Sequence, residues 1–439
     1  MPLRLLPQAG SRANIVAMLI TEPANAAAGI HRAPTVPTRV AHWGGVFAMT
    51  LCVFALIASE FMPVSLLTPI ASALQVSEGL AGQGIAISGA FAVLTSLTIS
   101  RVSQLFDRKM LLLALTALMG LSGAVVGLAA GYPMYMAGRA LIGVVVGGFW
   151  SMSAATAMQL VPKAGVPRAL ATFNGGNALA TVVAAPLGSY LGAVIGWRGA
   201  FFCLVPIAAA AFVWQYFSLP SMPPKPRRPS AGNVFRLLKR RSVALGMLAV
   251  GLFFMGQFAL FTYLRPFLET VTRVDVSMLS LMLLALGVAG FVGTTVVGLF
   301  VKRSLYGTLA LIPLAMAAIA VALVVVGASV PMTAALLAVW GLVATAAPVG
   351  WWTWLARTLP DDADAGGGLM VAVVQLSIAL GSTLGGMLFD HSGHATTFAF
   401  SAGLLLLAAW LAWLSRRALC KPYEPRSSMK ARRGSTLER

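Results

Sequence analysis

Long apolar stretches alternate with short polar breaks along most of the chain. From residue 43 onward the breaks carry charges, prolines or glycines, as in "QVSEG", "FDRK" and "PDDADAGGG". A helix needs roughly 20 apolar residues to cross about 30 Å of hydrocarbon. The pattern therefore predicts twelve membrane-spanning helices, near residues 43–69, 80–100, 110–131, 134–159, 167–195, 199–219, 243–268, 277–300, 308–328, 332–356, 366–389 and 396–415.

Composition supports this interpretation. Of the 439 residues, 59% are hydrophobic and only 10% are charged, which excludes a chain of ordinary soluble domains. The apolar stretches also lack the alternation of apolar and polar residues that marks the strands of a transmembrane barrel. We expect an all-α polytopic membrane protein, embedded in a lipid bilayer.

The net charge of +19 is distributed very unevenly. With a cytoplasmic N-terminus, every Lys and Arg lies in a cytoplasmic tail or loop except Arg139, Arg198, Arg265 and Arg273. The positive-inside rule then predicts that both termini lie in the cytoplasm. The basic clusters at residues 225–241 and 416–433 suit anionic lipid head groups better than nucleic acid, because no aromatic residues alternate with the basic ones.

An internal repeat divides the predicted helices into two halves. "SEFMPVSLLTP" in the first span aligns with "GQFALFTYLRP" in the seventh, which places Glu60 on Gln257 and Phe61 on Phe258. Similar matches relate the fourth span to the tenth, where Arg139 falls on Gly341, and the fifth to the eleventh. Repeats of this kind form a binding site between two halves that rock against each other, so the sequence predicts a transporter.

The repeat and the charge pattern together predict the domain organisation. We expect two pseudo-symmetric bundles of six helices, joined by a linker rich in proline and arginine. The predicted segments are a cytoplasmic N-terminal tail (1–42), an N-terminal bundle (43–219), a cytoplasmic linker (220–242), a C-terminal bundle (243–415) and a basic cytoplasmic tail (416–439).

Two ionisable residues, Glu60 and Arg139, lie inside predicted spans. Charged groups inside a membrane cost about 2.5 to 3.5 kcal/mol each on insertion scales, so they usually have a function. The depths of the two residues along their helices overlap, which allows a salt bridge or a water-bridged contact. One interpretation is a static ion pair that fixes helix packing; the other is a proton site, at which movement of the arginine switches the carboxyl between binding and releasing a proton.

Four further residues are candidates for binding a substrate: Gln257, Asn177, Trp340 and Gln375. The three amides lie near the middle of their spans, and Trp340 supplies a flat apolar face. Such groups suit a neutral, planar, polar solute. For each residue alone, hydrogen bonding between helices is an equally good explanation.

Other polar groups predict structure rather than chemistry. Arg265 and Glu269 are four residues apart and can pair at the outer end of the seventh span. Asp390, His391 and His394 are expected to form a solvated turn, because no nucleophile or metal-ligand spacing accompanies them. The three cysteines are widely separated, so neither a disulfide framework nor a metal or cofactor site is expected. The sequence also lacks a phosphate-binding G-x-x-x-x-G-K-[ST] loop, which excludes an ATPase of that type.

At the level of motifs, residues 43 to about 415 resemble the twelve-helix drug:proton antiporter branch of the major facilitator superfamily. "ASEFMPVSLLTPIA", "GRALIGVVVGGFWSMSAA" and "PVGWWTWLARTL" look in particular like bacterial purine ribonucleoside efflux pumps. Arg139 and Gly143 match the Arg-x-x-x-Gly pattern of the family's fourth helix. In the loop after the second span the chain departs from the family pattern, because Asp107 stands where the pattern has glycine.

The resemblance implies a proton-coupled exporter of purine ribonucleosides, such as inosine and guanosine, that acts by alternating access. It assigns proton carriage to Glu60 and a part in proton coupling to Arg139. We expect the chain to act as a monomer. The alternatives are efflux of sugars, drugs or other small metabolites by the same mechanism, and, from another class, a membrane-embedded enzyme. An enzyme would need an acid, a base and a nucleophile at one depth, and the acidic residues are too scattered for that.

Overall fold

The computed structural model describes residues 41–224, 234–359 and 363–419, and every regular element in these residues is helical. The first eight helices belong to residues 43–219, which we call the N-terminal half. They are α1 (Trp43–Ser65), α2 (Leu67–Leu74), α3 (Glu78–Val102), α4 (Arg108–Gly127), α5 (Tyr132–Leu160), α6 (Val166–Val194), α7 (Gly196–Phe202) and α8 (Leu204–Ser218), with a 3-10 turn, η1 (Lys163–Gly165), before α6.

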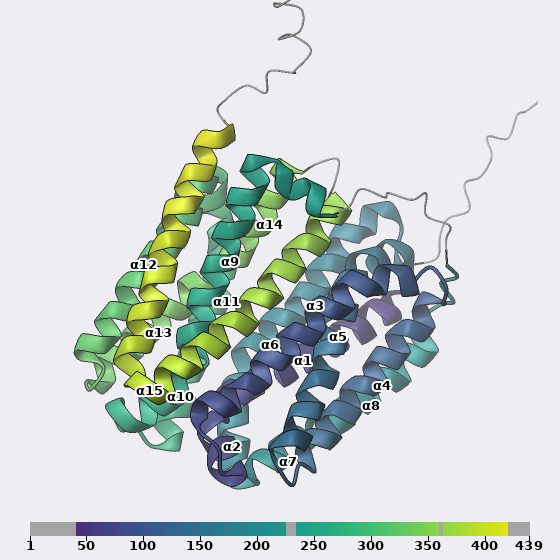
Figure 1. Cartoon of the computed structure of the whole chain (residues 1–439). Coiled ribbons are helices and arrows are strands. Elements are labelled where there is room, and N and C mark those ends of the chain that lie inside the picture. Colours follow the sequence, from purple (N-terminus) through teal and green to yellow (C-terminus); the bar gives the residue numbers. More distant parts are fainter. Residues whose placement is uncertain (1–40, 225–233, 360–362, 420–439) are drawn as a thin grey trace, which may run out of the picture. The chain divides into compact units, whose positions relative to one another are not determined.

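Residues 234–419 form the remaining elements, and we call residues 243–415 the C-terminal half. The elements are η2 (Val234–Lys239), α9 (Arg241–Phe261), α10 (Leu264–Phe267), η3 (Leu268–Thr272), α11 (Val276–Arg303), α12 (Leu305–Val326), α13 (Val330–Ala344), α14 (Ala347–Thr358) and α15 (Ala363–Leu419). The two halves lie beside each other in Figure 1, the first in purple and blue and the second in green and yellow.

The all-α prediction is confirmed, and the last two predicted spans form one interrupted helix. The described residues contain 11 helices long and apolar enough to cross a membrane, the last covering Gly366–Arg416. That segment is far too long for one crossing and is interrupted at Gly393, whose φ of 76° is a conformation that favours glycine. The two legs of α15 meet in a V in Figure 1, and they correspond to the eleventh and twelfth predicted spans.

Apolar side chains occupy both the interior and the outer surface. One cluster of buried residues lies almost wholly within the C-terminal half, and a second lies within the N-terminal half. Large apolar side chains also cover the outside, with Phe217 79%, Val325 77% and Leu299 69% exposed. Many large apolar side chains exposed in this way are typical of a surface that contacts lipid. The chain is a multi-pass membrane protein.

Glycines allow the helices around the centre to pack closely. A Cβ at Gly143 or Gly147 of α5 would stand 2.2 Å from a backbone oxygen of α3, at Ser88 and Ala92 respectively. The four-residue spacing of these glycines places both on one face of α5. The backbone of α3 is therefore held directly against α5.

The predicted domain boundaries at the tails remain predictions. The tails lie almost wholly outside the described residues, as does part of the linker, namely residues 1–40, 225–233 and 420–439. What the structure does show is that the start of the linker is held against the N-terminal half. This contact is made by Asp107, at the loop position where the family pattern has glycine.

Asp107 begins α4 and anchors the chain that follows α8. Its carboxylate caps α4 by accepting a bond from the Lys109 backbone N–H at 2.7 Å. It also accepts bonds from the Ser221 hydroxyl at 2.5 Å and from the Met222 N–H at 3.0 Å. Partial burial acts to raise the pKa of this carboxyl, but the bonds from Ser221, Met222 and Lys109 outweigh burial and hold the pKa below its usual value.

We expect the thermal stability of the protein to fall in acid partly because of Asp107. A folded-state pKa below the unfolded value of about 3.9 stabilises the fold above that pH, and the contribution is lost as the pH falls through the folded-state pKa. Asp107→Asn should lower the unfolding temperature at pH 6 and flatten its decline between pH 5 and pH 3. Thermal unfolding of detergent-solubilised protein measures both effects. A variant with the same pH profile as the wild type would contradict this assignment.

Candidate functional site

The stretch "SEFMPVS" in α1 contains a proline that frees a backbone carbonyl. Pro63 has no N–H, so the carbonyl of Ser59, four residues earlier, loses its usual helical partner. Arg139 of α5 fills this gap, because its Nη1 donates to the Ser59 oxygen at 2.9 Å and its Nε donates to the Gly84 oxygen of α3 at 3.1 Å. Arg139 is fully buried. One guanidinium therefore ties together α1, α3 and α5.

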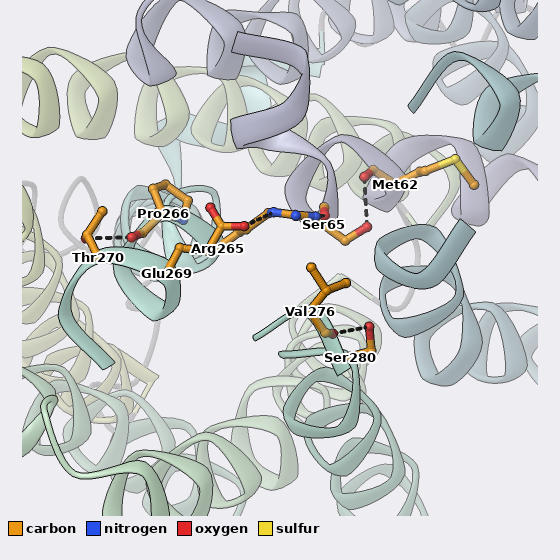
Figure 2. A network of polar contacts seen from close by, with 8 residues as sticks. All are labelled: Met62, Ser65, Arg265, Pro266, Glu269, Thr270, Val276 and Ser280. Carbon is orange, nitrogen blue, oxygen red and sulfur yellow. Dashed lines mark hydrogen bonds and ion pairs between the residues drawn. The ribbon is translucent and has the colours of Figure 1, made fainter. Parts of the chain in front are cut away.

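A second proline also leaves a backbone carbonyl without its helical partner, and here the arginine that bonds the carbonyl comes from the other half. Pro69 removes the partner of the Ser65 carbonyl, and Nη1 of Arg265, from α10 of the C-terminal half, donates to that oxygen. Nε of Arg265 also bonds Oε1 of Glu269 at 2.7 Å, which confirms the predicted pair. Figure 2 shows Arg265 lying between Glu269 and Ser65. Arg265 thus holds the two halves together at the end of the bundle that carries α2 and α10.

Glu60 is part-exposed and lies where the halves meet. Nε2 of Gln375, on α15 of the C-terminal half, donates to its Oε1 at 3.4 Å. Arg139 is near enough to Glu60 for an electrostatic interaction. The described hydrogen bonds of Arg139, however, go to backbone carbonyls, one of which belongs to the residue before Glu60. The carboxylate of one half therefore faces an amide of the other.

The residues that follow Glu60 and Gln257 in the repeat also meet. The ring of Phe61 stacks on that of Phe258, with centroids 6.2 Å apart, and packs edge-on against Phe261 at 6.1 Å. The two repeat-matched dipeptides, Glu60-Phe61 and Gln257-Phe258, consequently lie opposite each other across the two halves.

The expectation of a solvated turn at residues 390–394 is wrong for Asp390. Its side chain is exposed, but Oδ2 accepts a bond from the Ser77 hydroxyl at 2.5 Å and Oδ1 accepts one from the Gly79 N–H at 3.0 Å. A carboxylate of α15 thus satisfies one free N–H group at the start of α3, that of Gly79. A Cβ at Gly79 would stand 2.2 Å from this carboxylate, so the contact requires glycine there.

The remaining sequence candidates have different environments. Gln257 on α9 is part-exposed, yet its Oε1 is buried without a hydrogen-bond partner. Asn177 on α6 is also part-exposed. Trp340 on α13 is 1% exposed and belongs to the apolar cluster of the C-terminal half. Among the described contacts, none joins Asn177 or Trp340 to Glu60, so their assignment to the substrate stays a prediction.

Several residues of the site carried signals that sequence reasoning missed. Pro63 and Pro69 each imply a free carbonyl four residues earlier, and an unpaired carbonyl in hydrocarbon needs a donor. Arg139 and Arg265 were the available intramembrane donors. The contacts of Phe61 and Asp390 join segments from different halves, and no spacing along the chain indicates them. Within the described residues, no cluster of three His, Cys, Asp or Glu side chains could hold a metal ion.

Two helical halves with polar groups buried at their junction define a secondary transporter of the membrane. The sequence model of the Major Facilitator Superfamily matches residues 49–378. The chain belongs to this family of transporters and is not an enzyme.

Individual relatives share most of the chain. A transcription regulatory protein, OpdE of Pseudomonas aeruginosa, is 63% identical over 385 residues, which cover 87% of this chain and 96% of that protein. The purine ribonucleoside efflux pump NepI of Salmonella typhimurium is 42% identical over 368 residues, which cover 84% and 92%. Among solved structures, a D-xylose–proton symporter matches with a TM-score of 0.70 and 17% identity, covering 84% and 97%, and therefore shows the fold alone.

Replacing Arg139 should destabilise the fold more than the same change at a less buried arginine. Arg139→Lys cannot reach both carbonyls and should cost about 1.5 to 3 kcal/mol, the value of one charged hydrogen bond. Arg198 is a matched control, because its Nε and Nη2 also bond a carbonyl, that of Ala129, in a half-buried setting. Thermal unfolding in lipid nanodiscs compares Arg139→Lys with Arg198→Lys. Equal losses would contradict the anchoring role of Arg139.

Proposed function

We propose that this protein exports purine ribonucleosides, such as inosine and guanosine, in exchange for protons. The observation that carries the proposal is the position of Glu60, a part-exposed carboxylate of the N-terminal half that is bonded by Gln375 of the C-terminal half. An ionisable group at this junction experiences a different environment whenever the two halves move. That is the requirement for coupling a proton to alternating access.

Proton binding at Glu60 is sensitive to its neighbours for a simple reason. A charged carboxyl in a membrane depends on the few groups that can stabilise it, here the charge of Arg139 and the amide of Gln375. Because Gln375 belongs to the other half, rocking removes one of these groups while Arg139 stays. Proton loading and release can thus follow the movement without ATP.

The substrate class rests on two supports. NepI, a relative at 42% identity, is named a purine ribonucleoside efflux pump. The junction also offers what a planar, polar, neutral solute requires, namely the aromatic faces of Phe61 and Phe258 beside the amides of Gln257 and Gln375. Sugars and drugs remain the alternative substrates, and they would leave the mechanism unchanged.

The proposal also includes location and topology. We place the protein in the inner membrane, as its family and bacterial relatives suggest, and the distribution of Lys and Arg favours cytoplasmic termini. In that orientation the contacts of Arg265 and Asp390 close the external end of the site. We also propose that the chain acts as a monomer.

Export of labelled inosine tests the function. Loaded cells should export inosine faster when the outside is acidic, and Glu60→Gln should abolish the gradient-dependent part, because an amide cannot carry the proton. Glu78→Gln is the matched control, since Glu78 is a part-exposed carboxyl in the first turn of α3 and should tolerate the change. Gradient-dependent export that survives Glu60→Gln would remove the proton role. Export of sugars or drugs without nucleosides would replace only the substrate.

A regulatory effect is a second candidate, because OpdE, at 63% identity, is named a transcription regulatory protein. In the described part of the chain the long helices are membrane spans, so contact with a promoter is a poor explanation. A transporter can change transcription indirectly by altering the concentration of a solute that a separate regulator senses.

An indirect effect predicts that regulation and transport fail together. Transcript profiles of cells carrying the wild type, Glu60→Gln or a deletion should show the deletion pattern in the Glu60→Gln cells, provided the variant reaches the membrane at the wild-type level. A wild-type transcript profile in cells whose export is abolished would instead separate regulation from transport.

A further inference from the structure

The backbone of Gln375 is tightly packed, but only one end of its side-chain amide, Nε2, makes a hydrogen bond. It is 6% exposed, and α15 packs on α3 at this level. Gly89 of α3 makes the close approach possible, since a Cβ there would stand 2.7 Å from the Gln375 carbonyl oxygen. While α3 and α15 are packed in this way, the side chain can adjust only by its own torsions.

The Gln375 amide satisfies only part of its hydrogen-bonding capacity. Nε2 donates to Glu60, whereas Oε1 is buried and has no partner. A buried oxygen without a hydrogen-bond partner is unfavourable. In the conformation of this structure the site thus lacks a donor, and a bound ligand with an N–H or O–H group could supply it once α3 and α15 part.

The two ends of an amide have opposite hydrogen-bonding polarity and nearly the same size. A carboxylate can only accept, so it bonds the NH2 end. A protonated carboxyl has a hydroxyl to donate, and the carbonyl end of the amide is then the better partner. Half a turn about the last side-chain torsion exchanges the two ends with little change in volume.

We infer that Gln375 makes proton and substrate binding mutually exclusive. With Glu60 charged, Nε2 bonds Glu60 and Oε1 accepts an N–H from the substrate. With Glu60 protonated, the Glu60 hydroxyl donates to Oε1 of Gln375, and the amide rotates to accept this bond. The NH2 group of Gln375 then faces the N–H donor of the substrate, and the two donors repel each other. In this inference Gln375 is a substrate-binding residue whose orientation is set by the protonation of Glu60, and the inference rests on the proposed function.

The unpaired Oε1 requires a ligand with an N–H or O–H donor, and among the solutes of the proposed function the N1–H of inosine is such a donor. The charged group that faces Glu60 from the packed helices is Arg139 of α5, and Tyr135 of the same helix faces Arg139. Arg265 and Glu269 pair with each other nearer the end that carries α2. The pH dependence therefore centres on Glu60.

Binding of inosine to purified wild-type protein, measured between pH 8 and pH 5, tests the inference. Affinity should fall at least about tenfold toward pH 5. Glu60→Gln should bind with no pH dependence. Gln375→Met, of similar shape, should bind about tenfold more weakly at pH 8 and change less than about twofold with pH. Gln257→Met, the matched control, should weaken binding equally at every pH.

A second measurement needs no variant and so does not depend on folding. The ligand 1-methylinosine lacks the N1–H but keeps the rest of the molecule. Wild-type protein should prefer inosine about tenfold at pH 8, and this preference should vanish at pH 5, where Oε1 is occupied by Glu60.

The outcomes separate the inference from the function on which it rests. A pH dependence that Glu60→Gln removes but Gln375→Met keeps would overturn the role of Gln375 and leave proton coupling in place. A preference for inosine that is unchanged at pH 5 would do the same. Absence of inosine binding at every pH would overturn the substrate assignment and the inference together.

Discussion

The site depends on one constraint, which is that a backbone carbonyl inside a membrane must have a partner. Pro63 breaks this rule for Ser59, and the buried guanidinium of Arg139 restores it while also bonding Gly84. Arg139 is thus required for the structure of α1, independently of any role in transport. Its positive charge is thereby fixed close to Glu60, because Ser59 and Glu60 are adjacent. The same bonds that complete α1 set the electrostatics of the carboxylate.

The contacts between the halves form a series along α1, α3 and α15. Gln375 bonds Glu60, Phe61 stacks on Phe258, Arg265 bonds the Ser65 carbonyl, and Asp390 caps α3. Each of these interactions joins one half to the other, so each must break when the halves part at this end. The first of them includes Glu60. In the proposed mechanism, proton binding at Glu60 would therefore act on a contact that alternating access must also change.

Much of the fold followed from the sequence, whereas much of the site did not. Span length, composition and the repeat sufficed to predict a helical membrane protein in two halves, because these properties are repeated many times along the chain. Glu60 and Arg139 stood out since charges are rare in spans. The partner of Glu60 could not be predicted, because Gln375 competes with several other mid-span amides, and only packing at Gly89 selects it. Asp390 was misjudged because exposure of a turn residue does not exclude a structural contact.

The repeat explains why one carboxylate is preferable to two. Symmetry would allow an acid at Gln257 as well as at Glu60, yet two carboxyls at one junction would repel each other unless they shared a proton. An amide opposite a carboxyl has a suitable partner for either protonation state, since it both donates and accepts. The C-terminal half supplies such a group to Glu60 through Gln375. In the proposed mechanism, an amide opposite Glu60 would let this contact persist through a change of proton, with only its polarity reversed.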